Sequence, residues 1–376
     1  MKRVLIIAGE SSGDLHGSSL MKHMKAIESD IEFKGIGGKL MIIEGLDAVR
    51  HVRDMNFMGF VEVIRHLPFI RRTMIELISI LDSWNPDLVI LIDYPGFNLK
   101  FAPHAKQRKI PVMYYISPQL WAWHKSRVKI VKKNVDRMVV LFDFEKDFYS
   151  SHGVEADFVG HPLLDIVQPS QNSAEFRASL GAGDTSPIIG ILPGSRKQEI
   201  ERMLPPMIES LSVLKGYGHE VTAALGCASE IDDSYYESFI RGTDIKTLRD
   251  RTYDIMAHSD VLVVTSGTAT LEAGILGTPM IIVYRTSFLT YHIGKSLVNI
   301  PNIGLINIVA GSRIVPELWQ YDVSAKKIAE LADNFLKNGV LRETTSKALV
   351  SVKKRLGERG ASERAARIAF GMIHSQ

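Results

Sequence analysis

The chain has 376 residues, 45% of them hydrophobic and 23% charged, with a formal net charge of +3. These values are typical of an ordinary globular protein with two or three domains and give no argument for nucleic acid as a partner. The single cysteine, Cys227, excludes an internal disulfide, and no apolar run reaches the ~20 residues that span a bilayer. We therefore expect a cytoplasmic protein whose membrane contact, if any, is peripheral.

The first half of the chain alternates apolar runs with helix-favouring segments. Runs rich in β-branched residues predict buried parallel strands at 4–8, 31–35, 88–92, 111–116 and 137–141. Such an alternation is typical of a doubly wound α/β domain.

The turn after the first strand contains acids where a dinucleotide-binding turn has glycines. Glu10 and Asp14 stand in the sequence GESSGD, and the spacing G-x-G-x-x-G is absent. Because acids repel a pyrophosphate, this turn suits hydroxyl groups or proton transfer. A plain helix cap is the alternative reading of the turn, and His16 faces either the same cleft or solvent.

Residues 55–81 combine many large apolar side chains with interspersed arginines. This pattern suits a surface that takes acyl chains or lies on an anionic membrane. The alternative is that most of these side chains belong to the domain core. The residues expected at the surface are Phe57, Met58, Phe60, Val61, Ile64 and Leu67.

The strand at 88–92 delivers Asp93 to its carboxyl end, where open α/β folds keep their chemistry. An acid at this place is a candidate catalytic residue, with a structural role in the turn as the alternative. The next strand leads to residues 117–123, where Trp121 and Trp123 suit a stacking or packing wall.

Residues 165–187 are polar and rich in Pro, Gly and Ser, which indicates a domain boundary. The second half restarts with a strand at 188–192 and the turn Pro-Gly-Ser-Arg, which contains Ser195 and Arg196. A strand, a tight turn and a helix form an anion site, and an arginine can grip two phosphate oxygens. A role of Arg196 in capping or pairing alone is the alternative.

A second turn of this kind follows the strand at 261–265. Ser266, Gly267 and Thr268 precede a helix, and Glu272 lies one helical turn later, where its carboxylate could accept hydrogen bonds from a ribose diol. The alternative is one more β-α-β unit in which these residues only cap the helix.

Eight motifs in order along the chain resemble the lipid-A-disaccharide synthase family. They are AGESSGDLHG (8–17), GIGG (35–38), IDYPGFN (92–98), SPQLWAW (117–123), FVGHPL (158–163), LPGSR (192–196), TSGTATLEAG (265–274) and NIVAG with VPELWQ (307–311, 315–320). The resemblance covers nearly the whole length, and the set is far more specific than any one motif.

The resemblance implies a GT-B fold, in which two Rossmann-like doubly wound α/β domains face a cleft and a C-terminal helix crosses back to the N-terminal domain. Residues 1–168, with a helix at about 358–376, would form the acceptor and membrane-side domain. Residues 186–357 would bind the nucleotide sugar, and residues 169–185 would link the two.

The resemblance also implies an inverting hexosyltransferase in lipid A and lipopolysaccharide biosynthesis. The reaction joins UDP-2,3-diacylglucosamine to 2,3-diacylglucosamine 1-phosphate (lipid X) and releases UDP and a β-linked disaccharide 1-phosphate. It takes place at the cytoplasmic face of the inner membrane, against an anionic surface, without a metal or other cofactor. The sequence leaves the oligomeric state open, a homodimer included.

Residue by residue, Asp93 matches the acid to which the family's base is ascribed, with Glu10 and Asp14 as rivals. Arg196, the turn 266–268, Glu272 and Asn307 match the nucleotide-sugar pocket, and Gln320 is a weaker match. No family role is assigned to His16.

Two other functions remain open on the same architecture. A UDP-sugar 2-epimerase would use the same nucleotide half but needs no acyl surface. A non-catalytic sugar- or lipid-binding protein fits two domains around a cleft but gives no reason for paired phosphate turns.

Overall fold

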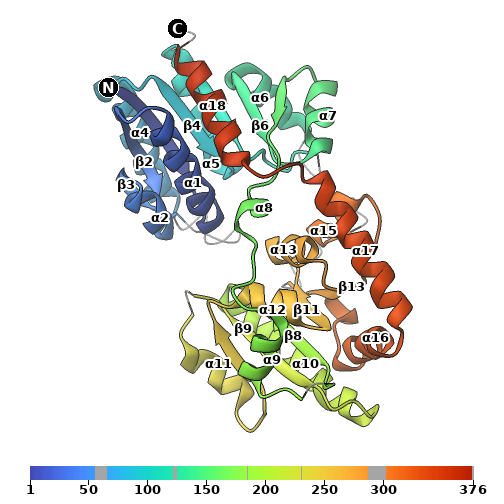
Figure 1. Cartoon of the computed structure of the whole chain (residues 1–376). Coiled ribbons are helices and arrows are strands. Elements are labelled where there is room, and N and C mark those ends of the chain that lie inside the picture. The colour runs from blue at the N-terminus through green and yellow to red at the C-terminus, as the bar shows by residue number, and fades with distance from the viewer. Residues whose placement is uncertain (56–65, 122–124, 184, 230, 287–301, 375–376) are drawn as a thin grey trace. The chain divides into compact units, whose positions relative to one another are not determined.

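A computed structural model describes residues 1–55, 66–121, 125–183, 185–229, 231–286 and 302–374. The chain divides into two compact units (Figure 1). The first combines Met1–Asp165 with Leu356–Gln376, and the second is Ile166–Arg355.

The first unit contains a seven-stranded sheet in the order β3-β2-β1-β4-β5-β6-β7, and all neighbouring strands are parallel. The strand order reverses between β1 and β4, whose residues from Val4 to Ala8 and from Leu88 to Ile92 are fully buried. The strands are β1 (Lys2–Ala8), β2 (Ile31–Gly37), β3 (Leu46–His51), β4 (Leu88–Ile92), β5 (Val112–Tyr115), β6 (Arg137–Val140) and β7 (Ala156–Phe158).

Helices cover both faces of this sheet. The last helix, α18, packs against α1 although more than three hundred residues separate them in the chain (Figure 1). The helices are α1 (Ser11–Ile27), α2 (Lys39–Ile43), α4 (Leu67–Trp84), α5 (Pro95–Gln107), α6 (Val128–Asn134), α7 (Asp143–Ser151), α8 (Leu163–Ile166, which runs one residue into the second unit) and α18 (Ala361–His374).

The second unit repeats this plan with six parallel strands in the order β10-β9-β8-β11-β12-β13. Here the order reverses between β8 and β11. The strands are β8 (Ile188–Leu192), β9 (Thr222–Cys227), β10 (Lys246–Arg249), β11 (Val261–Thr265), β12 (Met280–Tyr284) and β13 (Glu317–Trp319).

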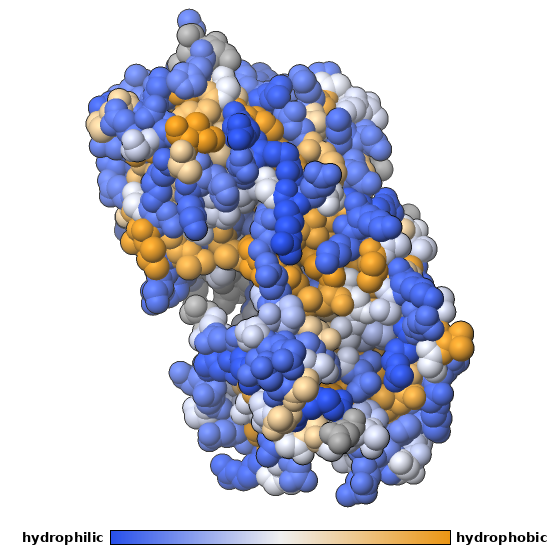
Figure 2. Space-filling model, viewed as in Figure 1, coloured by the Kyte–Doolittle hydropathy of each residue, from blue (hydrophilic) through white to orange (hydrophobic). Residues whose placement is uncertain are grey.

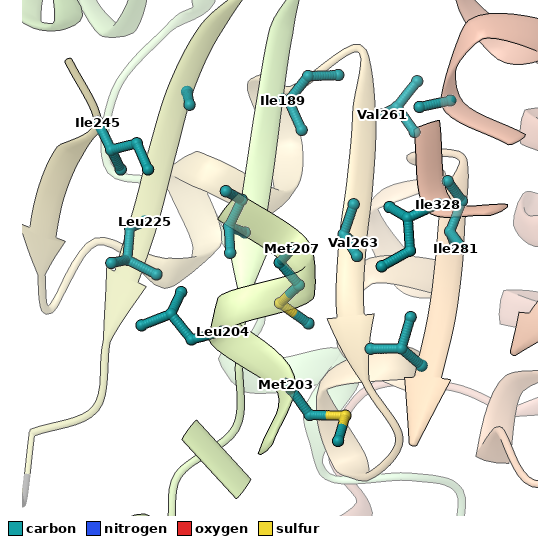
Figure 3. Packing of buried hydrophobic residues seen from close by; sticks show 14 of the residues in the cluster. Ile189, Met203, Leu204, Met207, Leu225, Ile245, Val261, Val263, Ile281 and Ile328 are labelled. Carbon is teal, nitrogen blue, oxygen red and sulfur yellow. The ribbon is translucent and has the colours of Figure 1, made fainter. Parts of the chain in front are cut away.

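One face of the second sheet forms a continuous apolar core with α10 and α16 (Figure 3). Met203, Leu204 and Met207 of α10 lie over Leu225 and Val263 of the strands. Each such side chain contributes about 1.5–3 kcal/mol when it leaves water. The helices of this unit are α9 (Ser173–Leu180), α10 (Lys197–Gly216), α11 (Asp233–Ile240), α12 (Thr252–His258), α13 (Thr268–Leu276), α15 (Leu305–Ala310), α16 (Ala325–Lys337) and α17 (Gly339–Arg355).

The prediction of two doubly wound α/β domains is confirmed, and so is that of a C-terminal helix belonging to the N-terminal half. In an open parallel sheet, ligands bind outside the carboxyl ends of the strands where the order reverses. Two such places follow from the topology, one in each unit.

Candidate functional site

The reversal point of the first sheet brings two acids together. Glu10 follows β1 and Asp93 follows β4, and the two strands are direct neighbours in the sheet. The charge of Glu10 acts on the carboxyl group of Asp93. Residues 83 positions apart in the sequence thus share one edge of the sheet.

The backbone around Asp93 has an unusual conformation. Asp93 and Tyr94 both have left-handed φ angles, 44° and 48°, which cost non-glycine residues free energy and persist only where the surroundings fix them. Asn98 Nδ2 donates a hydrogen bond to the Asp93 carbonyl oxygen at 2.7 Å, and the Tyr114 hydroxyl donates another to it at 2.5 Å. The Tyr94 ring leaves no room at Gly9, where a Cβ would lie 2.1 Å from a ring carbon. The backbone of Asp93 is thereby held at a fixed place.

Burial raises the pKa of the Asp93 carboxyl to about 7, with a further contribution from the charge of Glu10 and a small opposing effect of the Tyr94 backbone N–H. A carboxylate with a pKa near neutrality can accept a proton from an alcohol at physiological pH and release it again. The pKa of Asp93 is thus in the range that suits a general base.

Asp14 has a different role from the one predicted for it. Its Oδ1 accepts hydrogen bonds from the backbone N–H groups of Gly38 and Met41 at 2.7 and 3.0 Å, and its Oδ2 accepts one from Leu40 at 3.0 Å. The carboxylate therefore caps the start of α2. Since both oxygens are already used and the side chain is buried, the prediction of Asp14 as a rival base does not fit this arrangement.

His16 lies in the interior of the first unit, against the ring of His161, with 6.4 Å between the ring centroids. Its Nδ1 is buried without a hydrogen-bond partner. Burial lowers the pKa of His16 to about 4, and burial followed by the charge of His16 lowers that of His161 to about 3. Both histidines are therefore neutral at physiological pH.

At the reversal point of the second sheet, the turn after β8 forms a compact arrangement around Glu199. Glu199 Oε2 accepts a hydrogen bond from the Ser195 backbone N–H at 3.1 Å, and Oε1 accepts one from Arg196 Nη1 at 3.0 Å. Gly194 has φ +109°, and a Cβ there would lie 2.5 Å from Glu199 Oε2. An exposed ion pair of this kind contributes only about 0–1 kcal/mol. The exposed Arg196 can therefore turn to a diphosphate at little cost.

The turn after β11 lies beside the turn after β8, because β11 and β8 are neighbouring strands in the sheet. Ser266 Oγ donates to the Ile303 carbonyl oxygen at 2.8 Å, and α13 begins at Thr268. Gly267 and Thr268 are exposed, and the first N–H groups of a helix have no acceptor within the helix. Two helix N-termini, those of α10 and α13, thus lie at one edge of the sheet.

Glu272 lies on α13, mostly buried, and accepts a hydrogen bond from the Tyr253 hydroxyl at 3.2 Å. Burial raises the pKa of Glu272. Sequence reasoning missed Tyr253, because its partner lies 19 residues away on another helix and no local pattern joins the two.

Asn307 is 0% exposed, and both the nitrogen and the oxygen of its side-chain amide make hydrogen bonds. Its Nδ2 donates to the Val315 carbonyl oxygen and to Glu317 Oε1, and its Oδ1 accepts from the backbone N–H groups of Ile314 and Val315. The predicted contact of Asn307 with a nucleotide sugar does not fit this arrangement. Gln320 follows β13 with φ +54°, and its Oε1 accepts from the Thr286 backbone N–H at 3.2 Å.

The predicted apolar surface lies partly outside the described residues. Phe57, Met58, Phe60, Val61 and Ile64 fall there, whereas Leu67 begins α4 and is 49% exposed. Further along α4, Ile75 is 58% exposed while Thr73, Leu77 and Leu81 face the interior.

Helix α2 adds exposed apolar side chains that the sequence did not predict, Leu40, Ile42 and Ile43. Figure 2 shows hydrophobic surface in the region of α2. Within the described ranges, no helix has the length and apolar character needed to span a bilayer. Among the same residues, no group of three or more His, Cys, Asp or Glu is placed to hold a metal ion.

Comparison with solved structures places the fold among glycosyltransferases and epimerases of nucleotide sugars. A MnaA–UDP co-structure from S. aureus has a TM-score of 0.66 at 11% identity and covers 100% of this chain and 98% of its own. The calicheamicin glycosyltransferase CalG4 has a TM-score of 0.62 at 13% identity, with 99% and 98% covered. A UDP-GlcNAc 2-epimerase from Neisseria meningitidis bound to UDP-GlcNAc has a TM-score of 0.61 at 13% identity and covers both chains completely. These likenesses confirm the GT-B class of fold.

Sequence comparison separates the classes that share this fold. The lipid-A-disaccharide synthase of Geobacter sulfurreducens is 41% identical over 376 residues, which cover 100% of this chain and 98% of the relative. That of Syntrophus aciditrophicus is 42% identical over 375 residues, with 99% and 98% covered. The family model of lipid-A-disaccharide synthetase matches residues 4–369. The chain therefore belongs to the lipid-A-disaccharide synthetase family and is a glycosyltransferase of lipid A biosynthesis.

Proposed function

We propose that the chain transfers the diacylglucosamine of UDP-2,3-diacylglucosamine to 2,3-diacylglucosamine 1-phosphate, with inversion at the anomeric carbon. The products are UDP and a β-linked disaccharide 1-phosphate. The observation that carries the proposal is the division of chemistry between two reversal points, with acids at the first and paired anion-binding turns at the second.

In this mechanism Asp93 takes the proton from the acceptor's primary hydroxyl as its oxygen attacks the anomeric carbon. The bond from that carbon to the diphosphate breaks on the opposite face, so that UDP leaves with the bonding electrons. Burial keeps the pKa of Asp93 near neutrality, and the charge of Glu10 adds to this effect. A positioned general base contributes about 10²–10⁴-fold to the rate.

The leaving diphosphate gains negative charge in this step, and the second unit is suited to stabilise it. We assign its oxygens to Arg196, Ser195 and the N–H groups at the start of α13, including Gly267 and Thr268. Preorganised donors of this kind act most strongly where charge develops in the transition state. Glu272 is assigned to the ribose, with Tyr253 orienting its carboxylate.

The UDP moiety is supported by two proteins of the same fold, the MnaA structure with UDP and the N. meningitidis epimerase with UDP-GlcNAc. Fold alone leaves an epimerase open, but the full-length family match favours the transferase. In the domain assignment we propose, the first unit takes the acceptor and the second the donor. Residues 169–185, expected from the sequence to be a linker, belong to the second unit, where α9 packs against α12.

The acyl chains of both substrates require the enzyme to work at a membrane surface. We propose that α4 and the preceding residues 57–64 dock on the cytoplasmic face of the inner membrane. The exposed Leu67 and Ile75 of α4 stand with Arg71 and Arg72, also exposed. Apolar side chains enter the lipid boundary while arginines pair with anionic headgroups.

The decisive experiment incubates the purified chain with UDP-2,3-diacylglucosamine and 2,3-diacylglucosamine 1-phosphate in detergent micelles. We expect a disaccharide 1-phosphate on thin-layer chromatography and one UDP released per disaccharide. Conversion of the UDP-sugar to its 2-epimer without the acceptor would instead support the epimerase. Binding of both substrates without any product would support the non-catalytic reading.

A further inference from the structure

A buried carboxylate that the proposed chemistry does not use holds the loop after β5. Glu145 is 2% exposed and lies in the first turn of α7. Its Oε1 accepts hydrogen bonds from Ser117 Oγ at 2.6 Å and Trp121 Nε1 at 3.3 Å, and its Oε2 accepts from the Phe142 backbone N–H at 3.3 Å. All three partners donate, so the position requires a group that only accepts, which is a carboxylate and not an amide.

Keeping a carboxylate in this interior is unfavourable by itself, because a charged group loses its hydration on burial. Burial raises the pKa of Glu145 to about 7, although Ser117, Phe142 and Trp121 act in the opposite direction. A capping box for α7 alone needs only the Phe142 N–H. Because two side chains of the loop also donate to Glu145, this residue holds the loop in addition to capping the helix.

The rest of α7 holds the same loop. The Tyr149 hydroxyl donates to the Pro118 carbonyl oxygen at 3.2 Å, and Trp121 packs edge-on against Phe144 with 5.2 Å between ring centroids. Residues 117, 118 and 121 are thus each fixed to one helix. Gln119, between these fixed points, is exposed.

This loop begins beside the proposed base. Strand β5 pairs with β4, with Tyr115 opposite Ile92, and the Asp93 backbone N–H donates to the Tyr115 carbonyl oxygen at 3.2 Å. Ile116 then turns the chain with φ +65°, and Ser117 follows. The loop that Glu145 anchors at Ser117 therefore begins two residues after the hydrogen-bond partner of Asp93.

We propose that Glu145 is a positioning residue, which acts through Ser117 and Trp121 to hold residues 117–121 as a wall of the acceptor-sugar site, with Gln119 as the side chain that contacts the sugar. The inference rests on the proposed function, because Asp93 defines the acceptor site. It adds a specificity element that touches neither the nucleotide nor the reacting atoms.

The test measures acceptor and donor separately in Glu145→Gln and Ser117→Ala. We expect the Kd of 2,3-diacylglucosamine 1-phosphate, measured by calorimetry in micelles, to rise about tenfold, the scale of one lost hydrogen bond to a charged group. Acceptor KM should rise in parallel, and UDP affinity should stay unchanged. The double variant should be no worse than Glu145→Gln alone, because both changes remove one connection.

Two further variants distinguish loss of the loop contacts from a general loss of stability. Trp121→Phe keeps an aromatic ring beside Phe144 but has no N–H to donate to Glu145, so it should raise the acceptor Kd while leaving the melting temperature near that of the parent chain. Glu175→Gln is the matched control, because Glu175 has the same capping-box position in α9, where its Oε2 accepts a hydrogen bond from the Asn172 backbone N–H. It should change neither ligand's affinity.

An unchanged acceptor Kd in folded Glu145→Gln, or a double variant in which the two losses add, overturns the inference. Because the Kd is measured without turnover, this outcome is separate from failure of the proposed function. If the parent chain forms no disaccharide but Glu145→Gln still weakens acceptor binding, the function fails and the positioning role stands.

Discussion

At the scale of single residues, the acids at the ends of β1 and β4 interact through charge. Burial, with a further contribution from the charge of Glu10, raises the pKa of Asp93 to about 7. The raised pKa means that Asp93 is protonated below this pH and able to accept a proton above it. We therefore expect kcat/KM for disaccharide formation to increase as the pH rises through about 7.

Asp93→Asn keeps the shape of the side chain but cannot accept a proton. We expect turnover to fall by about 10²–10⁴-fold, with UDP affinity in calorimetry nearly unchanged. Glu10→Gln is the control: it should lower the pH of half-maximal activity, because it removes the charge that raises the pKa of Asp93. Normal turnover in Asp93→Asn together with loss in Glu10→Gln would reassign the base to Glu10.

Arg196 belongs to the donor side. In Arg196→Ala we expect UDP affinity to fall by about 1.5–3 kcal/mol, the value of a hydrogen bond to a charged group. Glu199 would lose its partner on Oε1 and keep the Ser195 N–H, so the turn should persist. The fold is checked by circular dichroism, and equal UDP affinity in the variant and the parent chain would refute the assignment.

Single polar residues show where sequence reasoning reaches its limit. Asp14 and Asn307 stand in motifs that resemble those of the family. Asp14 nevertheless accepts hydrogen bonds from backbone N–H groups at the start of α2, and Asn307 binds the backbone of residues 314–315 and the side chain of Glu317. Which polar side chain faces a ligand and which caps a buried backbone depends on distant segments, and a local pattern does not contain that information.

At the scale of elements, the buried interior strands gave a clear sequence signal, and two edge strands of the second sheet gave none. The runs at 88–92, 188–192 and 261–265 coincide with β4, β8 and β11, because a strand buried on both faces must be apolar throughout. The edge strands β10 and β13 were not predicted. Lys246–Arg249 has two exposed and two half-buried residues, so its sequence carries no apolar signal.

Helix α4 carries the described part of the proposed membrane surface. Leu67→Ser with Ile75→Ser should reduce binding to vesicles of anionic lipid, since each apolar side chain of this size is worth up to about 1.5–3 kcal/mol on full burial. Both side chains are exposed, so the fold should persist. Flotation of the protein with vesicles measures the effect.

The matched control for α4 is Ile42→Ser with Ile43→Ser on α2, which also removes two exposed apolar side chains. We expect the α2 variant to lose less vesicle binding than the α4 variant. Equal binding by the α4 variant and the parent chain would show that α4 does not enter the lipid.

At the scale of the whole molecule, a fall in pH changes the free energy of unfolding in opposite directions through the buried histidines and through the buried carboxyl groups. The folded-state pKa values of His16 and His161, about 4 and about 3, lie below the ordinary 6.5. Between pH 4 and 6.5 the unfolded chain therefore binds more protons at these two histidines than the folded chain does. As the pH falls through this range, the folded state is destabilised, because it keeps the histidines buried in their neutral form. The raised pKa values of Asp93 and Glu145 act in the opposite direction over this range.

Comparison of His16→Gln with the parent chain isolates the histidine. As the pH falls from 6.5 to 4, the unfolding free energy of the variant relative to the parent should rise, by up to about 1.4 kcal/mol per pH unit. Hydrogen exchange of β1 and β4 amides reports the first unit alone, which matters because two units need not unfold together. A difference independent of pH would show that His16 is not buried in its neutral form.

The packing of α18 on α1 has a consequence for synthesis of the chain. Residues 356–376 complete the first unit but leave the ribosome after the second unit, 166–355, is already made. The usual order, in which the N-terminal domain folds first, is therefore reversed: the donor half can close while the first sheet still lacks its last helix. A chain truncated after residue 355 should resist protease in the second unit and be cut in α1, and equal resistance of both would contradict this order.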